Sequence, residues 1–160
     1  MSFLALTIIG TPGTPLYVLR RDVYSGNLRL YGKEHKETLI DAHNYANDLI
    51  RLERFEEVKQ LLRGQIPVTR RVFGDSHDLT LTMRSLYAEA LSRDGDATLA
   101  NLREAVTTFE EIERTARRVL GGAHPTTKGL EISMQMARAA LRARETPPAG
   151  DTAAEGNLDS

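Results

Sequence analysis

The chain has 160 residues, of which 41% are hydrophobic and 27% are charged, a balance typical of one globular domain of ordinary size. Its 21 lysines and arginines face 22 acidic residues, so the formal net charge is −1 and we expect neither nucleic acid nor a membrane as a partner. There is no cysteine, which excludes disulfides, thiolate metal sites and cysteine nucleophiles and agrees with a reducing, cytoplasmic compartment.

The first ten residues, MSFLALTIIG, are apolar from Phe3 to Ile9 but contain no basic leading region. The apolar run is far shorter than the roughly 20 residues that cross a bilayer, so we expect neither a signal peptide nor a spanning helix here. The stretch GTPGTP at 10–15 is typical of a turn and separates this apolar run from the helix predicted after it. Residues 1–13 are therefore expected to form an apolar segment and a turn.

Residues 14–31 are predicted to form a helix that has no partner helix before it. Thr14 is a candidate N-cap, and Pro15 suits the first helical position because its missing N–H has no partner there anyway. The apolar residues that recur at helical spacing and predict its packing face are Leu16, Leu19, Val23, Leu30 and Tyr31. The helix is expected to end at Gly32. This stretch is half of a repeat that lacks its first helix.

One short motif occurs three times along the chain. Gly-x-x-His-x-x-Thr is found at 32–38, 74–80 and 121–127. The three histidines of the motif are His35, His77 and His124. They are separated by 42 and then 47 residues. Self-similarity at such a period is typical of arrays of small units that bury their apolar faces only by stacking on one another.

Each repeat is expected to be a pair of helices, which we call its first and its second helix. All three motifs are followed by a predicted first helix, and the first two motifs also by a second helix. The first helices are expected at about 36–52, 78–93 and 125–145. Two apolar stripes at helical spacing predict the second helices, at 55, 58, 61, 62, 66, 72 and 73 and at 102, 105, 106, 109, 112, 116, 119 and 120. The predicted helical repeat domain covers 14–145, with full repeats at about 32–73 and 74–120 and partial repeats at 14–31 and 121–145. Residues 146–160 are mostly small or polar and are expected to form a disordered tail.

Three sequence elements of the first full repeat resemble a known family. They are G-x-x-H-x-x-T-L at 32–39, N-x-A at 44–46 and aromatic-x-E-V at 55–58. This combination is similar to the tetratricopeptide repeats of the kinesin light chain type, whose unit is longer than the ordinary one of about 34 residues. The resemblance extends over about residues 15–145. It implies an all-α, right-handed superhelix of antiparallel helical hairpins.

The second and third repeats match this pattern less closely than the first. The second has Leu86-Tyr87-Ala88 in place of N-x-A. The third has Lys128 in place of the leucine of the motif and contains no N-x-A element. The third unit therefore looks like a terminal cap, which a repeat array needs because its last helix has no neighbour on one side.

The glycines and histidines of the motif have a structural explanation. Each glycine follows the end of an apolar helix, where a left-handed residue ends the helix at no steric cost. Each histidine comes three residues later, where the next helix begins, so we expect it to pack and hydrogen-bond at that junction. Repeat spacing would hold the three histidines far apart, so we do not expect them to converge on one metal ion.

Arg29, Arg71 and Arg118 occupy matching places just before the three glycines. One interpretation is a basic stripe for phosphate groups or an acidic partner. The other is that these arginines are cations at the negative ends of helices, where each stabilises its helix by roughly a few tenths of a kcal/mol. Their position favours the second interpretation.

In the architecture that the resemblance implies, the first helices line a concave groove. The non-core residues expected to bind a peptide there are His43, Asn44, Asn47, Arg51, Ser85, Glu89 and Arg93, and the same surface is expected to include Ile40, Ile50, Thr82 and Ser92. Asn44 and Asn47 lie three residues apart on one helix face, so both amides could bind the backbone of an extended peptide. Alternatively, the two amides hydrogen-bond the neighbouring helix.

The sequence therefore predicts a cytoplasmic, non-catalytic scaffold that binds a protein or an extended peptide segment and needs no cofactor. No metalloprotease motif, phosphate-binding loop or nucleophile elbow is present, and no set of titratable residues is expected to converge on one site. The alternative is a structural or assembly fragment of a longer repeat array. In that case the unpartnered helix at 14–31 would leave an apolar edge through which the chain could self-associate.

Overall fold

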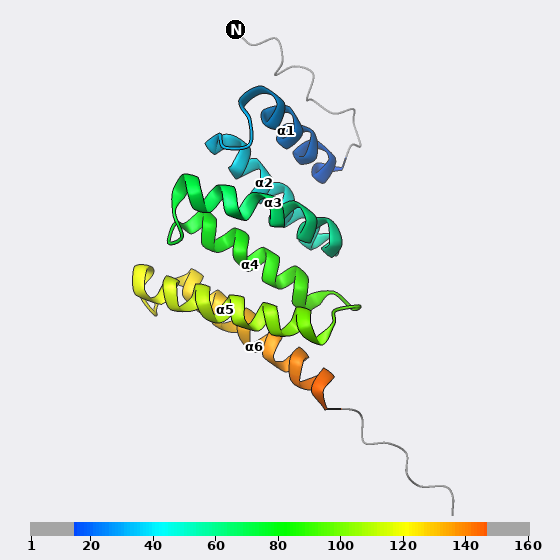
Figure 1. Ribbon diagram of the computed structural model, residues 1–160, viewed down its shortest axis with the longest axis vertical. Helices are drawn as coiled ribbons and strands as arrows, with labels where there is room; N and C mark the ends of the chain where they lie inside the picture. Colours follow the sequence, from blue (N-terminus) through cyan, green and yellow to red (C-terminus); the bar gives the residue numbers. More distant parts are fainter. Residues whose placement is uncertain (1–14, 147–160) are drawn as a thin grey trace, which may run out of the picture.

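The computed structural model describes residues 15–146, and within that range it consists of six α-helices and no strand (Figure 1). The helices are α1 (Leu16–Tyr31), α2 (Lys36–Arg51), α3 (Phe55–Phe73), α4 (Asp78–Arg93), α5 (Leu99–Leu120) and α6 (Pro125–Glu145). The predicted all-α class is thereby confirmed. The segment 1–13 and the tail predicted from residue 146 lie outside the described residues, apart from Thr146 itself.

The helix boundaries agree closely with the predicted ones, and the clearest difference lies at the start of α1. Pro15 has an extended backbone, with ψ of 141°, and precedes the helix instead of forming part of its first turn. The predicted cap, Thr14, lies outside the described residues. At α5 the start is fixed by a capping box, in which Thr98 and Asn101 each accept the backbone N–H of the other.

The six helices are arranged in two layers. Consecutive helices pack against each other across short turns, so neighbours run antiparallel. In addition α2 contacts α4 and α4 contacts α6, whereas the backbones of α1, α3 and α5 do not approach one another closely. A side-chain hydrogen bond between Tyr24 and Gln65 still joins α1 to α3. The helices α2, α4 and α6 therefore form an inner layer, while α1, α3 and α5 form an outer layer whose members are spread apart. The array runs from α1 at the top of Figure 1 to α6 at the bottom.

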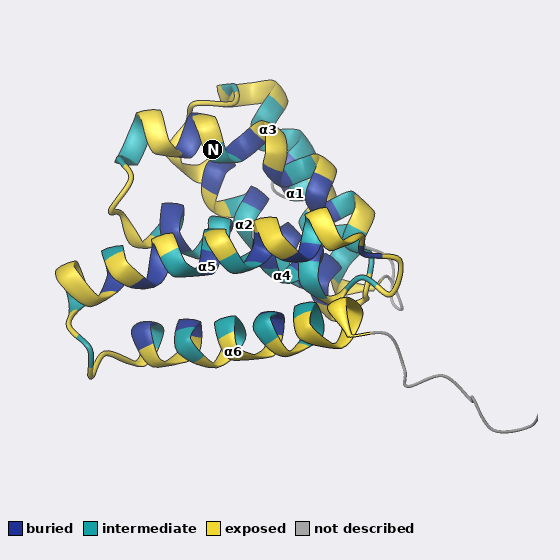
Figure 2. Cartoon of the chain, turned by 60° about the horizontal axis from the view of Figure 1, so that its bottom comes forward, coloured by how far each residue is buried: buried dark blue, intermediate teal, exposed yellow. Residues whose placement is uncertain are grey.

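Two clusters of buried side chains hold the layers together, and α4 takes part in both. Members of the first cluster, between α1 and α4, include Tyr24, Leu49, Leu62 and Met83. Members of the second, between α4 and α6, include Leu81, Leu91, Phe109, Ile112 and Leu130. Figure 2 shows these buried residues on the faces that the helices turn toward one another. Phe109 is the largest fully buried side chain, and cutting it to alanine would cost roughly 3–5 kcal/mol.

The turn from each outer helix into the next inner helix depends on a glycine with positive φ. Gly32, Gly74 and Gly121 have φ of 85°, 94° and 89° with ψ of 171°, 164° and 156°. The positive φ confirms the predicted left-handed residue at each turn, but ψ differs from the value of about 47° of the left-handed helical region. The observed region is open essentially to glycine alone. A Cβ at these positions would meet no atom of another residue within 4 Å, so the constraint comes from the local backbone.

Each histidine of the motif caps the inner helix that follows it. The Nδ1 atoms of His35, His77 and His124 accept a hydrogen bond from the backbone N–H two residues on, at 3.3, 3.1 and 3.2 Å. The first turn of a helix has four N–H groups without intrahelical partners, and this bond satisfies one of them. His35 and His77 also stack on Tyr31 and Phe73, with ring centroids 4.7 and 4.5 Å apart. The predicted junction role of the histidines is confirmed.

The threonine of the motif closes the same turn. Thr80 donates its hydroxyl hydrogen to the carbonyl oxygen of Gly74 at 2.7 Å, and Thr127 does so to Gly121 at 2.9 Å. Both threonines are fully buried, so these bonds satisfy hydroxyls that water does not reach. Thr38 is equally buried, but its hydroxyl has no hydrogen-bond partner among the described residues. The recurring Gly-x-x-His-x-x-Thr pattern is therefore a turn that reverses the chain and caps the next helix, and in the second and third units its threonine also bonds back to the glycine.

The packing face predicted for α1 is wrong in part. Leu16, Leu30 and Tyr31 have exposed fractions of 59%, 58% and 57%, and the buried residue of this helix is Tyr24. The Tyr24 hydroxyl accepts a hydrogen bond of 2.9 Å from Nε2 of Gln65 in α3. Because the backbone of α1 packs closely against only one other helix, α2, and α1 reaches α3 only through side chains such as Tyr24, it cannot bury all the apolar positions that helical spacing brings to one stripe.

Candidate functional site

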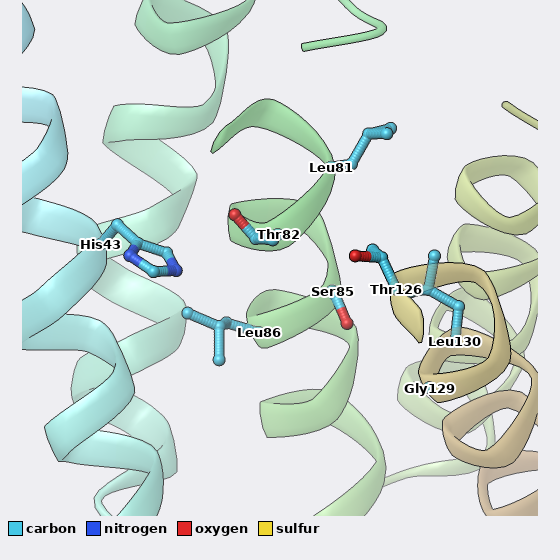
Figure 3. Close-up of a pocket in the computed structure, with 8 residues that line it drawn as sticks. All are labelled: His43, Leu81, Thr82, Ser85, Leu86, Thr126, Gly129 and Leu130. Atoms are coloured by element: carbon cyan, nitrogen blue, oxygen red, sulfur yellow. The ribbon is translucent and has the colours of Figure 1, made fainter. Parts of the chain in front are cut away.

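The inner layer carries a hollow of about 250 Å³ on α4, between α2 and α6 (Figure 3). It is built from side chains of all three inner helices. The lining residues are His43, Leu81, Thr82, Ser85, Leu86, Thr126, Gly129 and Leu130. Three successive helices of the array thus contribute to one continuous surface.

The hollow is mainly aliphatic, with a few polar groups beside it. Leu81, Leu86 and Leu130 supply the apolar surface, and Ser85 and Thr126 place hydroxyl groups next to it (Figure 3). This combination is typical of binding sites, but small-molecule sites usually measure about 300–1,000 Å³. The hollow is therefore suited to a single side chain of a larger partner rather than to a whole small molecule.

His43 forms the α2 wall of the hollow, and its ring points toward Thr82 and Leu86 of α4 (Figure 3). Burial lowers the pKa of the His43 imidazole below the ordinary value of 6.5, and a hydrogen bond to Asn44 and the charge of Asp78 oppose this shift only in part. The ring is therefore neutral at pH 7, with one donor and one acceptor nitrogen. A neutral imidazole can bind either an N–H or a C=O group of a peptide.

Gly129 keeps the α6 side of the hollow open. It lies inside α6, and a Cβ at this position would meet no atom within 4 Å. The equivalent residues in the two earlier repeats are Thr82 and Ile40, 47 and then 42 residues back. The third inner helix therefore has no side chain where the other two have one. Glycine inside a helix is roughly 0.5–1 kcal/mol less favourable than alanine, so the open space comes at a cost to the stability of α6.

Two of the seven predicted peptide-binding residues line this hollow, His43 and Ser85. Thr82, expected on the same surface, lines it as well. Asn44 instead lines a separate hollow, which lies between α1 and α2. The pair of amides predicted to act together at 44 and 47 is therefore not part of the hollow on α4.

The remaining predicted residues lie away from the hollow. Glu89 and Arg93 bind each other on α4 through an ion pair of 2.6 Å, and the Arg93 guanidinium lies 5.4 Å from the ring centroid of Phe55. On α2, Asn47 is half-buried and Arg51 is exposed. The pairing of Glu89 with Arg93 leaves little net charge at this end of the inner layer.

Two apolar assignments made from the sequence are wrong. Ile50 was expected on the groove surface, but only 4% of it is exposed and it belongs to the first core cluster. Val119 was expected in the core, but 51% of it is exposed. Both residues lie next to a helix end, where the chain turns away and helical periodicity no longer predicts which neighbour lies opposite.

Sequence reasoning missed the contribution of α6 to this surface. Besides its three residues in the hollow, α6 exposes Ile132 by 60% and Met136 by 64%. These two residues occupy the positions that Ser85 and Glu89 hold in α4, 47 residues earlier. The apolar surface therefore continues along α6. The register of the shared Gly-x-x-His-x-x-Thr motif places Ile132 and Met136 at these groove positions, so the signal is present in the sequence.

Of the three arginines at matching places before the motif glycines, Arg71 forms an ion pair, whereas Arg29 and Arg118 form none within residues 15–146. Arg71 pairs with Glu34, and Arg70 pairs with Asp75 in the turn after α3. A hollow of about 630 Å³ lies near them on α3, α4 and α5, lined by Arg70, Asp75, Arg84, Glu111, Arg114, Thr115 and Arg118. Four arginines and two acidic residues line this hollow, so its surface is mixed in charge with an excess of positive charge.

Within residues 15–146, no group of three or more His, Asp or Glu side chains is placed to hold a metal ion. None of the helices in this part of the chain has the length and apolar character needed to cross a membrane. Comparisons with protein-family models, curated proteins and solved structures give no match. Function is therefore inferred from the residues of the chain itself.

Proposed function

We propose that the protein is a non-catalytic, cytoplasmic scaffold that binds an extended peptide segment of a partner protein along its inner layer. The observation that supports this function most directly is the hollow shared by α2, α4 and α6. Repeat arrays bind partners on the extended surface that their successive units build together. The absence of cysteine agrees with a reducing compartment.

The proposal includes the architecture of the array. The backbones of the inner helices lie close to one another while those of the outer helices do not, and such packing curves an array with its inner helices on the concave side. The recurring turn motif repeats this packing along the chain. Both features support a right-handed superhelix of helical hairpins, similar to tetratricopeptide repeats of the kinesin light chain type, in which α1 and α6 are partial units.

The lining of the hollow indicates the chemistry of the partner. One aliphatic side chain of the partner would enter among the three leucines, and its neighbours would lie along Ile132 and Met136. Ser85 and the neutral His43 would bind the peptide backbone beside this anchor. Full burial of one aliphatic side chain contributes about 1.5–3 kcal/mol, whereas micromolar affinity requires about 8 kcal/mol. Several such contacts are therefore needed, and the expected affinity is micromolar or weaker.

Selection from a phage-displayed random peptide library, followed by fluorescence anisotropy with the selected peptides, tests this function. Gly129→Met would fill the hollow and should weaken binding at least about tenfold, the equivalent of 1.4 kcal/mol. Gly64 lies exposed inside α3 in the outer layer, so Gly64→Met is the matched control and should leave binding unchanged. Peptides that bind the Gly129→Met variant as tightly as the wild type would contradict the proposed site.

A second candidate function is that of an assembly piece that associates through α1. It is favoured by the exposed apolar residues Leu16 and Leu30 on that helix. Light scattering at micromolar concentration distinguishes the two functions, because an assembly piece should show a mass above that of the monomer.

At the opposite end of the array, the face of α6 that corresponds to the α5-facing side of α4 is polar. Lys128 and Gln135 of α6 are exposed at the positions where α4 buries Leu81 and Ala88 against α5. A further outer helix would therefore meet a polar face on α6. If the protein is an assembly piece, we therefore expect it to associate through α1 and not through α6.

A further inference from the structure

The first outer helix lacks a cover that the other two outer helices have. Leu16 of α1 is equivalent to Val58 of α3 and Ala105 of α5, which follow at intervals of 42 and 47 residues. Val58 and Ala105 are fully buried, whereas 59% of Leu16 is exposed. The helices α3 and α5 each pack against the inner helix that precedes them, α2 or α4. Within the described residues, no inner helix precedes α1.

A hollow of about 300 Å³ marks the uncovered place. It is lined by residues of α1 and α2, namely Leu16, Leu19, Arg20, Val23, Asp41 and Asn44. The residues of α4 equivalent to Asp41 and Asn44 are Met83 and Leu86, which pack into the first core cluster together with residues of α2. The hollow therefore lies where an inner helix preceding α1 would pack.

We propose that residues 3–9 of the same chain occupy this hollow in place of the missing inner helix. The segment reads FLALTII, with no charged residue and six apolar residues out of seven. Only residues 10–15 separate it from Leu16, and they include two glycines and two prolines, a composition that favours chain reversal. An apolar segment is thus tethered directly beside an uncovered apolar surface.

Both charged residues that line the hollow, Arg20 and Asp41, interact with other side chains of α1 and α2. Arg20 pairs with Asp48 at 2.7 Å, and Asp41 accepts a hydrogen bond of 2.6 Å from Asn27. The charge of Arg20 is compensated by Asp48, and the Asp41 carboxylate is hydrogen-bonded by the neutral Asn27 amide, so neither charged group of the hollow lacks a partner within the described structure. An uncharged segment such as residues 3–9 matches the hollow.

Tethering favours this segment over a second copy of the chain. A short flexible linker holds its end at an effective concentration of about millimolar, roughly a thousand times that of separate copies at micromolar concentration. Residues 3–9 would therefore cover α1 before another chain could do so. In this arrangement the segment completes the N-terminal end of the array and suppresses self-association through α1.

Spin labelling can locate the segment, because the chain has no cysteine and Ser2→Cys provides a single attachment site just outside it. With a nitroxide at this site, the methyl NMR signals of Leu19 and Val23 should broaden, whereas those of Ile132 on α6 should not. A second sample mixes two proteins. One is isotope-labelled and has no cysteine, and the other carries the spin label but no isotope label. No broadening is expected there if each segment binds its own chain.

Leu19→Asp serves as the control variant because it places a charge in the hollow. It should abolish the broadening of Val23 while circular dichroism shows unchanged helicity. Broadening in the mixed sample would assign the hollow to a second copy of the chain. No broadening in the singly labelled protein would leave the segment undocked, and either result would overturn the proposal.

Deletion of residues 1–13 gives an independent test that needs no label. It should lower the melting temperature by several degrees and make the mass in light scattering rise with concentration, because the hollow on α1 is then open. A deletion variant with unchanged melting temperature and unchanged mass would also overturn the proposal.

Discussion

The side-chain amide of Asn27 donates a hydrogen bond of 2.6 Å to the carboxylate of Asp41 and so joins α1 to α2. At the same place in the next outer-to-inner junction, the Thr69 hydroxyl contacts the Met83 sulfur at 3.2 Å. The first junction of the array is therefore held by a polar pair where the next one buries a methionine. Polar pairs of this kind depend on both partners, because either one alone leaves an unsatisfied group.

Replacing one partner of this pair should therefore cost more than replacing both. Asp41→Ala is expected to destabilise the protein by about 1–3 kcal/mol, because the Asn27 amide loses its partner at a partly buried site. The double variant Asn27→Thr/Asp41→Met, which copies the next junction, should recover most of that loss. Urea unfolding of the wild type, Asn27→Thr, Asp41→Met and the double variant measures the coupling. Additive losses would show that the pair contributes nothing as a pair.

Replacement of His77 should reveal a cap rather than a ligand. His77→Ala removes the acceptor for the Leu79 N–H and the contact with the Phe73 ring, so we expect a loss of about 1 kcal/mol. His77→Asn keeps an acceptor at the cap and should lose less. Zinc titration by calorimetry provides the check on function: stoichiometric binding by the wild type that His77→Ala lacks would contradict a purely structural role.

Substitution of Gly74 should be costly even though space is available around it. Its φ of 94° and ψ of 164° lie in a region that other residues avoid, so Gly74→Ala is expected to lose about 1–3 kcal/mol. Gly64 is the matched control, because it lies inside α3 with ordinary helical geometry and free space. Gly64→Ala should gain about 0.5–1 kcal/mol. Denaturant unfolding of both variants measures the contrast, and equal effects would argue against the backbone explanation.

Titration of His43 should make the fold less stable in mild acid. Burial holds its pKa below the ordinary 6.5, so between that value and the lower folded pKa the unfolded chain binds more protons than the folded one. The free energy of unfolding therefore has its full value above the pKa of His43 in the unfolded chain, and it decreases as the pH falls through that pKa. Between about pH 7.5 and pH 5.5, the melting temperature of the wild type should fall more than that of His43→Asn. Identical pH profiles would show that the ring is not buried in solution.

Most of the fold could be predicted because its signals are local. The bond from Leu79 to His77 spans two residues, and that from Thr80 to Gly74 spans six. Contacts of this range leave a constant spacing in the sequence, and this spacing locates the turns and hence the helices. The order of inner and outer helices follows from the turns.

The candidate site could be predicted only in part. His43 and Ser85 follow from the register of the first two inner helices, and both line the hollow on α4. The contribution of α6 to the hollow was missed because the motif before α6 lacks the leucine that marks the other two units and carries Lys128 instead. A sequence also does not reveal the volume of the hollow, because the open space at Gly129 depends on how three helices approach one another.

The sequence by itself determined where each helix begins and ends, because caps and turns are set by bonds between residues a few positions apart. Only the tertiary structure decided which side of α1 is covered. Tyr24 is buried and hydrogen-bonds Gln65, 41 residues further along the chain, while Leu16 on the same helix remains exposed. Helical spacing describes one helix at a time, whereas burial depends on what lies opposite. A helix whose backbone packs closely against only one neighbour, as α1 does against α2, leaves part of its apolar stripe without a cover.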